Sequence, residues 1–404
     1  MPYPRDAPLP RAEPAEVGVS AHGLRRLDDA LRDEIDRRLI PGAVLGVARR
    51  GRVAHLATYG YRDAAAEVPM TLDTLFWAAS MTKPLTVATA MTLVEGGAIA
   101  LDDPVTAHLP ELAGLEVGEA VGADLRRVPL ARPLTLRHLA THTAGMVEGF
   151  LEGSPVHRLY AEAFGNGMTD LDGAEFLARI ARLPLFNQPG ALWHYGFGID
   201  VLGLLLERVS GGPLRDLMAR RLLLPLGMED TGFGLRPADT ERYARPLAID
   251  PDTGAPQALP DLGRARFDSG GAGAVTTAGD YLRFAAMLVA GGALGDATVL
   301  RPGSVAEMTR DQLGPGVDVS RIGGDEPTLA GYGFGLGVAV RRDGHAALAG
   351  TPGDYTWAGA GGTYWWADPR RELAVVLMTH TPALPARRRH RELVRRLVLA
   401  ALID

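Results

Sequence analysis

Strand-like patterns occupy the two ends of the chain, and helix-like patterns with proline- and glycine-rich loops fill the space between them. Near the N-terminus, two apolar runs flank a glycine turn, which is typical of a hairpin; they are Ala43 to Ala48 and Val53 to Thr58. Near the C-terminus, strand patterns return at Gly333 to Val340, Gly362 to Ala367 and Leu373 to Thr379. We therefore expect an α+β fold with an antiparallel sheet built from both termini, flanked by helices, plus a mainly helical insert.

Three helices stand out from the periodicity of apolar residues. Residues 21–39 carry leucine and isoleucine at helical spacing and end at Pro41-Gly42. Phe197 to Val209 is the clearest helix of the middle region. The dense basic run Arg387 to Arg391 begins a third pattern, which predicts an amphipathic terminal helix with a solvated basic face.

The chain shows no internal repeat, and no compositional break in the middle marks a linker. A length of 404 residues, 47% of them apolar, suits one large domain or two closely packed ones. We expect an N-terminal arm over residues 1–20 and a single domain over 21–404. Within that domain, residues 21–75 and 331–404 would form the α/β part and residues 76–330 the helical part.

Composition and charge exclude several classes of function. A net charge of −6 gives no hint of nucleic-acid binding. The absence of cysteine excludes disulfides, thiol catalysis and thiolate metal sites. No apolar run approaches the roughly 18 residues of a membrane helix, and the polar N-terminus lacks the apolar core of a signal peptide. We therefore expect a cytoplasmic protein without a membrane partner.

A single lysine carries the strongest chemical signal. Of 42 basic residues, 41 are arginine and one is Lys83, which stands three places after Ser80. Arginine stays charged at working pH, whereas a lysine amine can lose its proton and act as a base. Pro84 predicts that a helix begins near Ser80, because proline is tolerated only in a first turn. Residues three apart share one helix face, so the two side chains should meet.

This pair predicts nucleophilic catalysis. A serine hydroxyl attacks only when a neighbouring base accepts its proton, and a neutral Lys83 one turn away can do so. We expect burial to lower the pKa of Lys83 toward that neutral form. Backbone N–H groups at the helix start can help to hold an oxyanion. The alternative is a surface lysine on a helix.

The run Ser80-Met81-Thr82-Lys83 resembles the first motif of the penicillin-recognising serine enzymes. Their second motif, Ser-x-Asn or Tyr-x-Asn at the mouth of a helix, is matched best by Tyr195-Gly196-Phe197. The resemblance implies that Tyr195 relays protons between Ser80, Lys83 and the leaving group. The alternative for Tyr195 is a core tyrosine.

The third motif of those enzymes, Lys-Thr-Gly, cannot be present because the one lysine is already used. Its expected place holds Trp357-Ala358-Gly359-Ala360, which is similar to family VIII carboxylesterases. That resemblance implies a β-lactamase/transpeptidase-like fold and an oxyanion hole made by the N–H groups of Ser80 and Ala360. Trp357 could instead be a packed core aromatic. Further stretches that look like this family are residues 134–145, 269–281 and 331–337.

The departures from the family pattern indicate the substrate. Trp357 stands where β-lactamases hold a cation for the substrate carboxylate, and Phe197 stands where they hold an asparagine. With Gly359, these residues would line an apolar substrate site that favours uncharged acyl groups of modest size. We therefore expect a serine carboxylesterase that acts on small-molecule esters of short to medium acyl length, without metal or cofactor.

Several alternatives remain open from the sequence. An acyltransferase would use the same Ser-Lys-Tyr triad; a β-lactamase or D-amino-acid peptidase, or a non-catalytic binding protein on the same fold, is less favoured. No Gly-x-Ser-x-Gly nucleophile elbow is present. His138 and His142 stand four apart, as two zinc ligands on a helix could, but a structural role is favoured. The oligomeric state and the alcohol side of the ester stay open.

Overall fold

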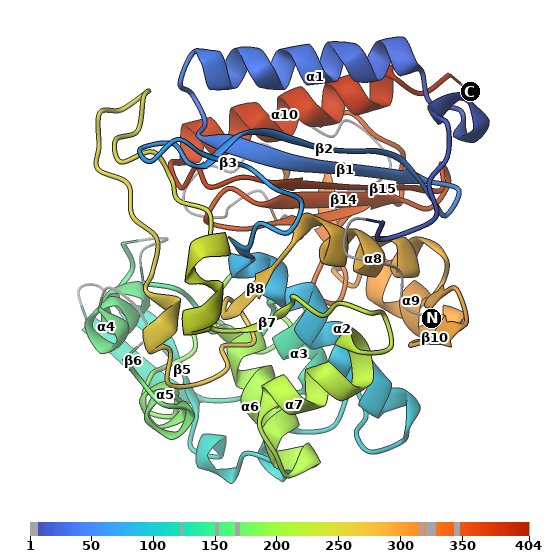
Figure 1. The fold of residues 1–404 in the computed structure, drawn as a ribbon. Helices are drawn as coiled ribbons and strands as arrows, with labels where there is room; N and C mark the ends of the chain where they lie inside the picture. Colours follow the sequence, from blue (N-terminus) through green and yellow to red (C-terminus); the bar gives the residue numbers. More distant parts are fainter. Residues whose placement is uncertain are drawn as a thin grey trace.

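The computed structural model describes residues 7–121, 124–149, 153–165, 170–314, 317, 319, 329–342 and 348–403. Figure 1 shows a sheet covered on one face by two long helices, α1 (Ala21–Asp36) and α10 (Leu384–Ala400). A larger, mainly helical region lies against the opposite face. The predicted α+β arrangement, with a sheet drawn from both ends of the chain, is confirmed.

The described residues form one large antiparallel sheet of eight strands, in the order β11-β12-β13-β14-β15-β1-β2-β3. Its centre is the pairing of the C-terminal β15 with the N-terminal β1, in which Val47 lies opposite Val375. The strand bounds are β1 Gly42–Arg49, β2 Arg52–Asp63, β3 Val68–Pro69, β11 Tyr332–Phe334, β12 Ala339–Arg341, β13 Tyr355–Ala358, β14 Tyr364–Asp368 and β15 Leu373–Met378.

Each face of this sheet carries its own apolar core, because successive side chains of a strand point to opposite faces. Along β1, Leu45 and Val47 pack with α1 and α10, whereas Val44 and Ala48 pack toward the helical region. The main helix on that second face is α8 (Ala278–Val289). A sheet buried on both faces explains why β1 is apolar from Gly42 to Ala48.

The helical region holds the remaining helices and three small sheets. The helices are α2 Thr82–Glu95, α3 Leu136–Ala140, α4 Pro155–Phe164, α5 Gly173–Ile180, α6 Gly198–Ser210, α7 Leu214–Met218 and α9 Pro302–Thr309. The small sheets are β4 Phe76–Trp77 with β8 Ala274–Thr276 and β7 Gly232–Phe233, β5 Glu116–Val121 with β6 Asp124–Pro129, and β9 Ala293–Leu294 with β10 Ala297–Thr298.

Two sequence predictions differ from the structure near the C-terminus. Residues 333–340 do not form one strand but the hairpin β11–β12, in which Phe334 pairs with Ala339. The turn between them contains Gly337 at φ +76°, a conformation that glycine adopts without strain. The basic face of α10 is also less solvated than expected, because His390, Arg391 and Arg395 are buried.

The expected N-terminal arm lies outside the described residues up to residue 6, and its remainder packs against the sheet. Ala12 donates a backbone hydrogen bond to Val53 O (3.0 Å), and Ser20 donates one to Ala401 O (2.7 Å). Leu9 and Val17 are buried. Among the described residues, no helix has the length and apolar character needed to cross a bilayer.

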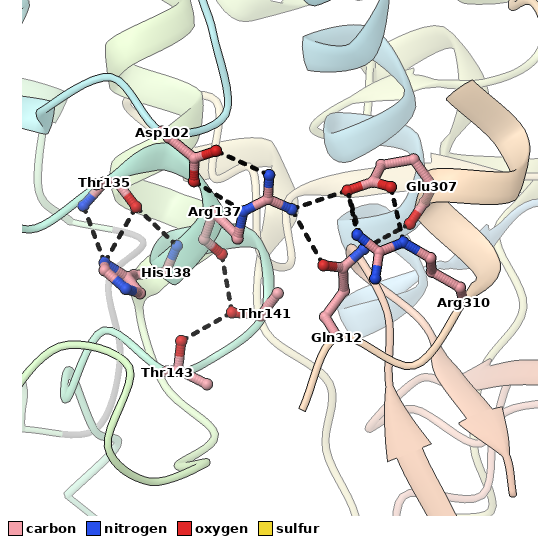
Figure 2. Close-up of polar contacts among 9 residues, drawn as sticks. All are labelled: Asp102, Thr135, Arg137, His138, Thr141, Thr143, Glu307, Arg310 and Gln312. Atoms are coloured by element: carbon pink, nitrogen blue, oxygen red, sulfur yellow. Dashed lines mark hydrogen bonds and ion pairs between the residues drawn. The ribbon is translucent and has the colours of Figure 1, made fainter. Parts of the chain in front are cut away.

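A network of charged and polar side chains fixes the short helix α3 (Figure 2). Arg137 makes a two-point ion pair with Asp102, at 2.8 and 3.0 Å, and donates further bonds to Glu307 (2.8 Å) and Gln312 (3.0 Å). Arg137 thereby joins α3 to the segment around Asp102 and to the segment from Glu307 to Gln312. The chain leaves α3 toward residues 141–147, which line the site described next.

Candidate active site

The small sheet β4–β8–β7 brings together two segments that are almost 200 residues apart. Phe76 pairs with Thr276, and the Ala78 N–H donates to Ala274 O at 2.9 Å. Ser80 stands three residues after the end of β4, and the loop 269–273 directly precedes β8. This pairing therefore places the serine turn beside the glycine-rich loop.

Ser80, Lys83 and Tyr195 converge as the sequence predicts. Ser80 Oγ lies 2.5 Å from the Tyr195 hydroxyl oxygen, and Lys83 Nζ lies 3.3 Å from Ser80 Oγ. Lys83 Nζ also lies 4.5 Å from the centre of the Tyr195 ring. Lys83 is 2% exposed and Tyr195 is 7% exposed, whereas Ser80 is half-buried. An amine, a phenol and a reachable hydroxyl thus lie together, as serine nucleophile chemistry would require.

Ser80 lies in a short 3₁₀ turn, Ala79–Met81, which leads into α2 at Thr82. The helix therefore starts two residues later than its expected beginning at Ser80, and Pro84 occupies its first turn as predicted. Ala79 has φ +48°, a left-handed conformation that is uncommon for a residue with a side chain. Such backbone strain clusters at functional sites, here directly before the serine.

Tyr195 is held at the start of α6 by close backbone packing. Phe197 is the residue before the first turn of that helix, which runs from Gly198. A Cβ on Gly196 would collide with the Met146 carbonyl, so this position needs glycine for space. The segment after α3 and the tyrosine turn are therefore pressed together.

Aromatic rings surround the Tyr195 side chain. The Trp357 ring centre lies 5.7 Å from that of Tyr195, and the Phe334 ring lies 5.2 Å from Trp357. Trp193 packs at 5.6 Å against Phe334, and His142 lies 4.7 Å from Tyr195. These rings pack around the phenol and hold it in place.

His142 is a site neighbour to which the sequence assigned no chemistry. It is 1% exposed, has φ +55°, and neither ring nitrogen has a hydrogen-bond partner among the described residues. Burial and the nearby Lys83 hold its pKa well below the usual range, so it stays neutral. His138 instead bonds Thr135 through Nδ1 (Figure 2), which favours the structural role over a shared zinc site.

The predicted oxyanion turn lies against the serine turn. A Cβ on Gly359 would stand 2.5 Å from Ala78 O, so only glycine fits there. Gly359 N–H donates to Thr363 O and Gly362 N–H donates to Gly359 O, and neither bond uses the N–H of Ala360. The buried Arg391 donates to Gly359 O at 3.4 Å, which ties α10 to this turn. Ala360 as an oxyanion donor stays a prediction.

Phe197 packs among aromatic rings of α4 and α5. Its ring centre lies 4.7 Å from Phe164 and 5.7 Å from Phe176, and it stacks on Tyr160 at 6.2 Å. The side chain thus joins α6 to α4 and α5. Phe197 as a substrate contact stays a prediction.

Comparison with known proteins identifies the chain. A sequence model of the family described as Beta-lactamase matches residues 27–400. The chain belongs to the β-lactamase family. Its fold is therefore β-lactamase/transpeptidase-like, as the motifs predicted.

Several relatives and a structural neighbour of this β-lactamase-family chain are named as esterases or as a hydrolase. Esterase EstB of Burkholderia gladioli is 34% identical over 400 residues, which cover 91% of this chain and 93% of EstB. Lovastatin esterase of Penicillium rubens is 30% identical over 381 residues, 87% of this chain and 91% of the relative. The solved structure of EstCE1, a hydrolase with promiscuous acyltransferase activity, superposes with a TM-score of 0.77 at 29% identity, covering 93% of this chain and 98% of EstCE1.

The resemblance to family VIII carboxylesterases is confirmed by these relatives. The chain is a serine hydrolase of the esterase kind, and ester hydrolysis or acyl transfer is the chemistry that its family membership and relatives support.

The charge state of Lys83 in this β-lactamase-family site differs from the sequence expectation. Burial does lower the pKa of Lys83, but Tyr195, Glu148 and Asp200 raise it, and the net shift is upward. Burial raises the pKa of Tyr195, although the Lys83 charge opposes this. The resting pair therefore carries a proton that must leave before Lys83 can act as a base. The expectation was wrong because it counted burial without Tyr195 and the two nearby carboxylates, which raise the pKa of Lys83.

Glu148 and Asp200 are site residues that sequence reasoning missed. Burial raises the pKa of the partly exposed Glu148 to about 7, and Asp200 adds to this while Lys83 opposes it. Burial also raises the pKa of Asp200, which is 2% exposed. An acid within the apolar run from Ile199 to Leu206 was the available signal for Asp200. No comparable signal marked Glu148.

Two surface cavities lie away from this pocket. One of about 420 Å³ is lined by residues of α5, α6 and the segment 266–268, and one of about 650 Å³ by residues 105–116 and 129–134. Ser80, Lys83 and Tyr195 line neither of them, so the candidate site is defined by its side chains and not by these two cavities.

Proposed function

We propose that this protein is a serine carboxylesterase that hydrolyses short-to-medium acyl esters through an acyl-enzyme on Ser80. Lys83 is the base of acylation, Tyr195 relays protons, and the N–H groups of Ser80 and Ala360 hold the oxyanion. The observation that carries the proposal is the contact of Ser80 Oγ with both the Tyr195 hydroxyl (2.5 Å) and Lys83 Nζ (3.3 Å).

The reaction follows from these contacts. Once the Lys83–Tyr195 pair has lost a proton, Ser80 Oγ attacks the ester carbonyl carbon and gives its own proton to that pair. The bond to the alcohol breaks, and the pair returns this proton to the departing oxygen. Water then attacks the acyl-enzyme with the same proton transfers, which releases the carboxylic acid and restores Ser80.

The substrate preference rests on the wall of the pocket. Trp357 is 5% exposed and packs against Tyr195, at the place where a β-lactamase would offer a cation. An apolar ring cannot pair with the carboxylate of a penicillin, but it can pack on an uncharged acyl chain. We therefore expect esters to be turned over much faster than β-lactams.

The test is parallel turnover of p-nitrophenyl butyrate and nitrocefin by the wild type, Ser80→Ala and the control Ser304→Ala. We expect fast ester cleavage that only Ser80→Ala abolishes, and little nitrocefin turnover. Dominant nitrocefin turnover, or ester cleavage that survives Ser80→Ala, would overturn the proposal.

Acyl transfer is a second candidate function, favoured by the likeness to EstCE1, a hydrolase with promiscuous acyltransferase activity. The triad is the same, and the acceptor decides between water and alcohol. Addition of 1-butanol to the p-nitrophenyl butyrate assay tests this. Butyl butyrate that forms faster than butyric acid would favour the transferase.

A further inference from the structure

Lys83 has a second anchor besides Ser80. Its Nζ donates to the carbonyl oxygen of Gly271 at 2.8 Å, a shorter contact than the 3.3 Å to Ser80 Oγ. A neutral amine has two N–H bonds and one lone pair. When one N–H is committed to Gly271 O, the amine is oriented and its lone pair can face Ser80. The position of the Gly271 carbonyl therefore determines the direction in which the lone pair of Lys83 points.

Asp200 holds the loop that carries this carbonyl. Its Oδ1 accepts a hydrogen bond from Ser269 Oγ (2.5 Å) and another from the Gly271 N–H (3.1 Å). Gly271 thus gives its N–H to Asp200 and its C=O to Lys83. Gly271 therefore links the buried Asp200 carboxylate to the Lys83 amine through two hydrogen bonds.

The fit between the loop and α6 leaves no spare room. A Cβ on Gly271 would collide with the Asp200 carboxylate, and a Cβ on Gly270 would stand 2.7 Å from Ile199 O. Thr86 of α2 also donates to Gly270 O at 2.8 Å. The loop is therefore clamped between α2 and α6 and has little freedom to move.

Asp200 also lies on the element that positions the second proton carrier. It stands five residues after Tyr195, in the first turn of α6, and is 2% exposed. A buried carboxylate is retained only where hydrogen bonds or opposite charge offset its desolvation. Here both do, because Ser269 and Gly271 donate to it and Lys83 lies near.

We propose that Asp200 is a positioning residue for the reaction: through Ser269 and Gly271 it holds the carbonyl that orients Lys83. The inference rests on the proposed role of Lys83 as base. Asp200 does not touch Ser80 and is not assigned a step of its own.

The negative charge of Asp200 also changes the pKa of Lys83 in a definite direction. The groups that face Lys83 are Tyr195, Glu148, Asp200 and the neutral His142. Asp200 raises the pKa of Lys83, so its removal lowers the pH at which the base form appears. The acidic limb of kcat/KM, which reports groups of the free enzyme, should then move to lower pH.

The experiment compares Asp200→Asn, Ser269→Ala and the control Asp280→Asn with the wild type, using p-nitrophenyl butyrate across pH, with Tm for each variant. Asp280 is an equally buried carboxylate that bonds Thr231 Oγ1 and the Asp230 N–H, away from the loop. We expect Asp200→Asn to lower kcat by ~10²-fold with little change in KM, the scale of a misplaced catalytic group. Its acidic limb should shift to lower pH.

Ser269→Ala keeps the carboxylate but removes one of its donors. It should lower kcat less and leave the acidic limb in place, while Asp280→Asn should change Tm alone. If Asp200→Asn does not fold, Ser269→Ala carries the positioning test. Wild-type kcat and an unmoved limb in folded Asp200→Asn would overturn the inference. Lys83→Arg separates the two proposals: if it is active, the role of Lys83 fails; if it is inactive while Asp200→Asn is normal, only Asp200 is misassigned.

Discussion

Strand β13 lies between two buried polar clusters of opposite character. At its end, Trp357 packs on the Tyr195 ring of the reaction site. Just before its start, Asp354 binds two buried arginines. Both clusters contain buried charged side chains. The cluster around Ser80 holds side chains that can give or accept a proton, whereas the cluster around Asp354 holds arginines that stay protonated.

The arginine cluster is saturated with partners. Asp354 accepts from Arg341 Nε at 2.8 Å, from Arg395 Nη2 at 2.5 Å and from the Tyr332 hydroxyl at 3.0 Å. Arg395 also donates to the Tyr364 hydroxyl at 2.9 Å. The arginines stay charged at working pH and give fixed donors, so this cluster can only be structural.

The Ser80 site has the opposite design. Its cation is the one lysine of the chain, and its partners are a phenol, a hydroxyl and a backbone carbonyl. Each of these side chains can give or take a proton. A chain that uses arginine at 41 of 42 basic positions therefore has its one lysine at the place where the proposed reaction requires a proton to leave.

The sharpest way to break this contrast is to exchange the cations. Lys83→Arg should be nearly as damaging as Ser80→Ala, with kcat down at least ~10³-fold, because arginine keeps the charge but cannot act as a base. Arg395→Lys should keep its activity and lose stability. Steady-state kinetics with p-nitrophenyl butyrate measure the first effect. Substantial activity in Lys83→Arg would mean that another group is the base.

Removal of a single phenol oxygen distinguishes a reacting tyrosine from a packing one. Tyr195→Phe should lower kcat at least ~10²-fold, since it removes the proton relay but keeps the ring. Tyr355→Phe is the control, because Tyr355 is also buried and its hydroxyl has no partner among the described residues. Equal kcat values for the two variants would show that Tyr195 is a packed core residue and not a proton relay.

The arginine cluster should fail through stability. Asp354→Asn leaves Arg341 and Arg395 buried with their charge uncompensated, which should cost roughly 3–5 kcal/mol in urea unfolding. Asp33→Asn is the exposed control, since the Arg37–Asp33 pair is more than half solvent-exposed on both sides and should matter little. An unchanged unfolding midpoint in Asp354→Asn would contradict the structural role.

Replacement of Glu148 should have the smallest of these effects, a modest shift in the pH dependence of kcat/KM. Its pKa of about 7 means that it is charged above neutrality, where it raises the pKa of Lys83. Glu148→Gln removes this effect, so the acidic limb of kcat/KM should move down by up to roughly one pH unit. A limb that stays in place would show that Glu148 does not act on the Lys83–Tyr195 pair.

Local patterns were sufficient for several elements and, together with the family resemblance, for the three side chains that meet at Ser80. The start of α2 followed from Pro84 to within two residues, whereas Tyr195 was chosen because Tyr195-Gly196-Phe197 resembles the family's second motif at the mouth of a helix. Apolar runs at the two ends predicted β1 and β15, whose pairing builds the large sheet. Such patterns report on helix and strand periods, which depend on near neighbours in sequence.

What the chain sequence determined was therefore the order of elements and the identity of the groups that can react. The folded structure alone decided the protonation of Lys83, the anchoring of its amine by Gly271 and the burial of the α10 arginines. These depend on contacts such as Asp200 with residues about 70 positions away. Electrostatic shifts arise from distances in space, which a linear pattern does not contain.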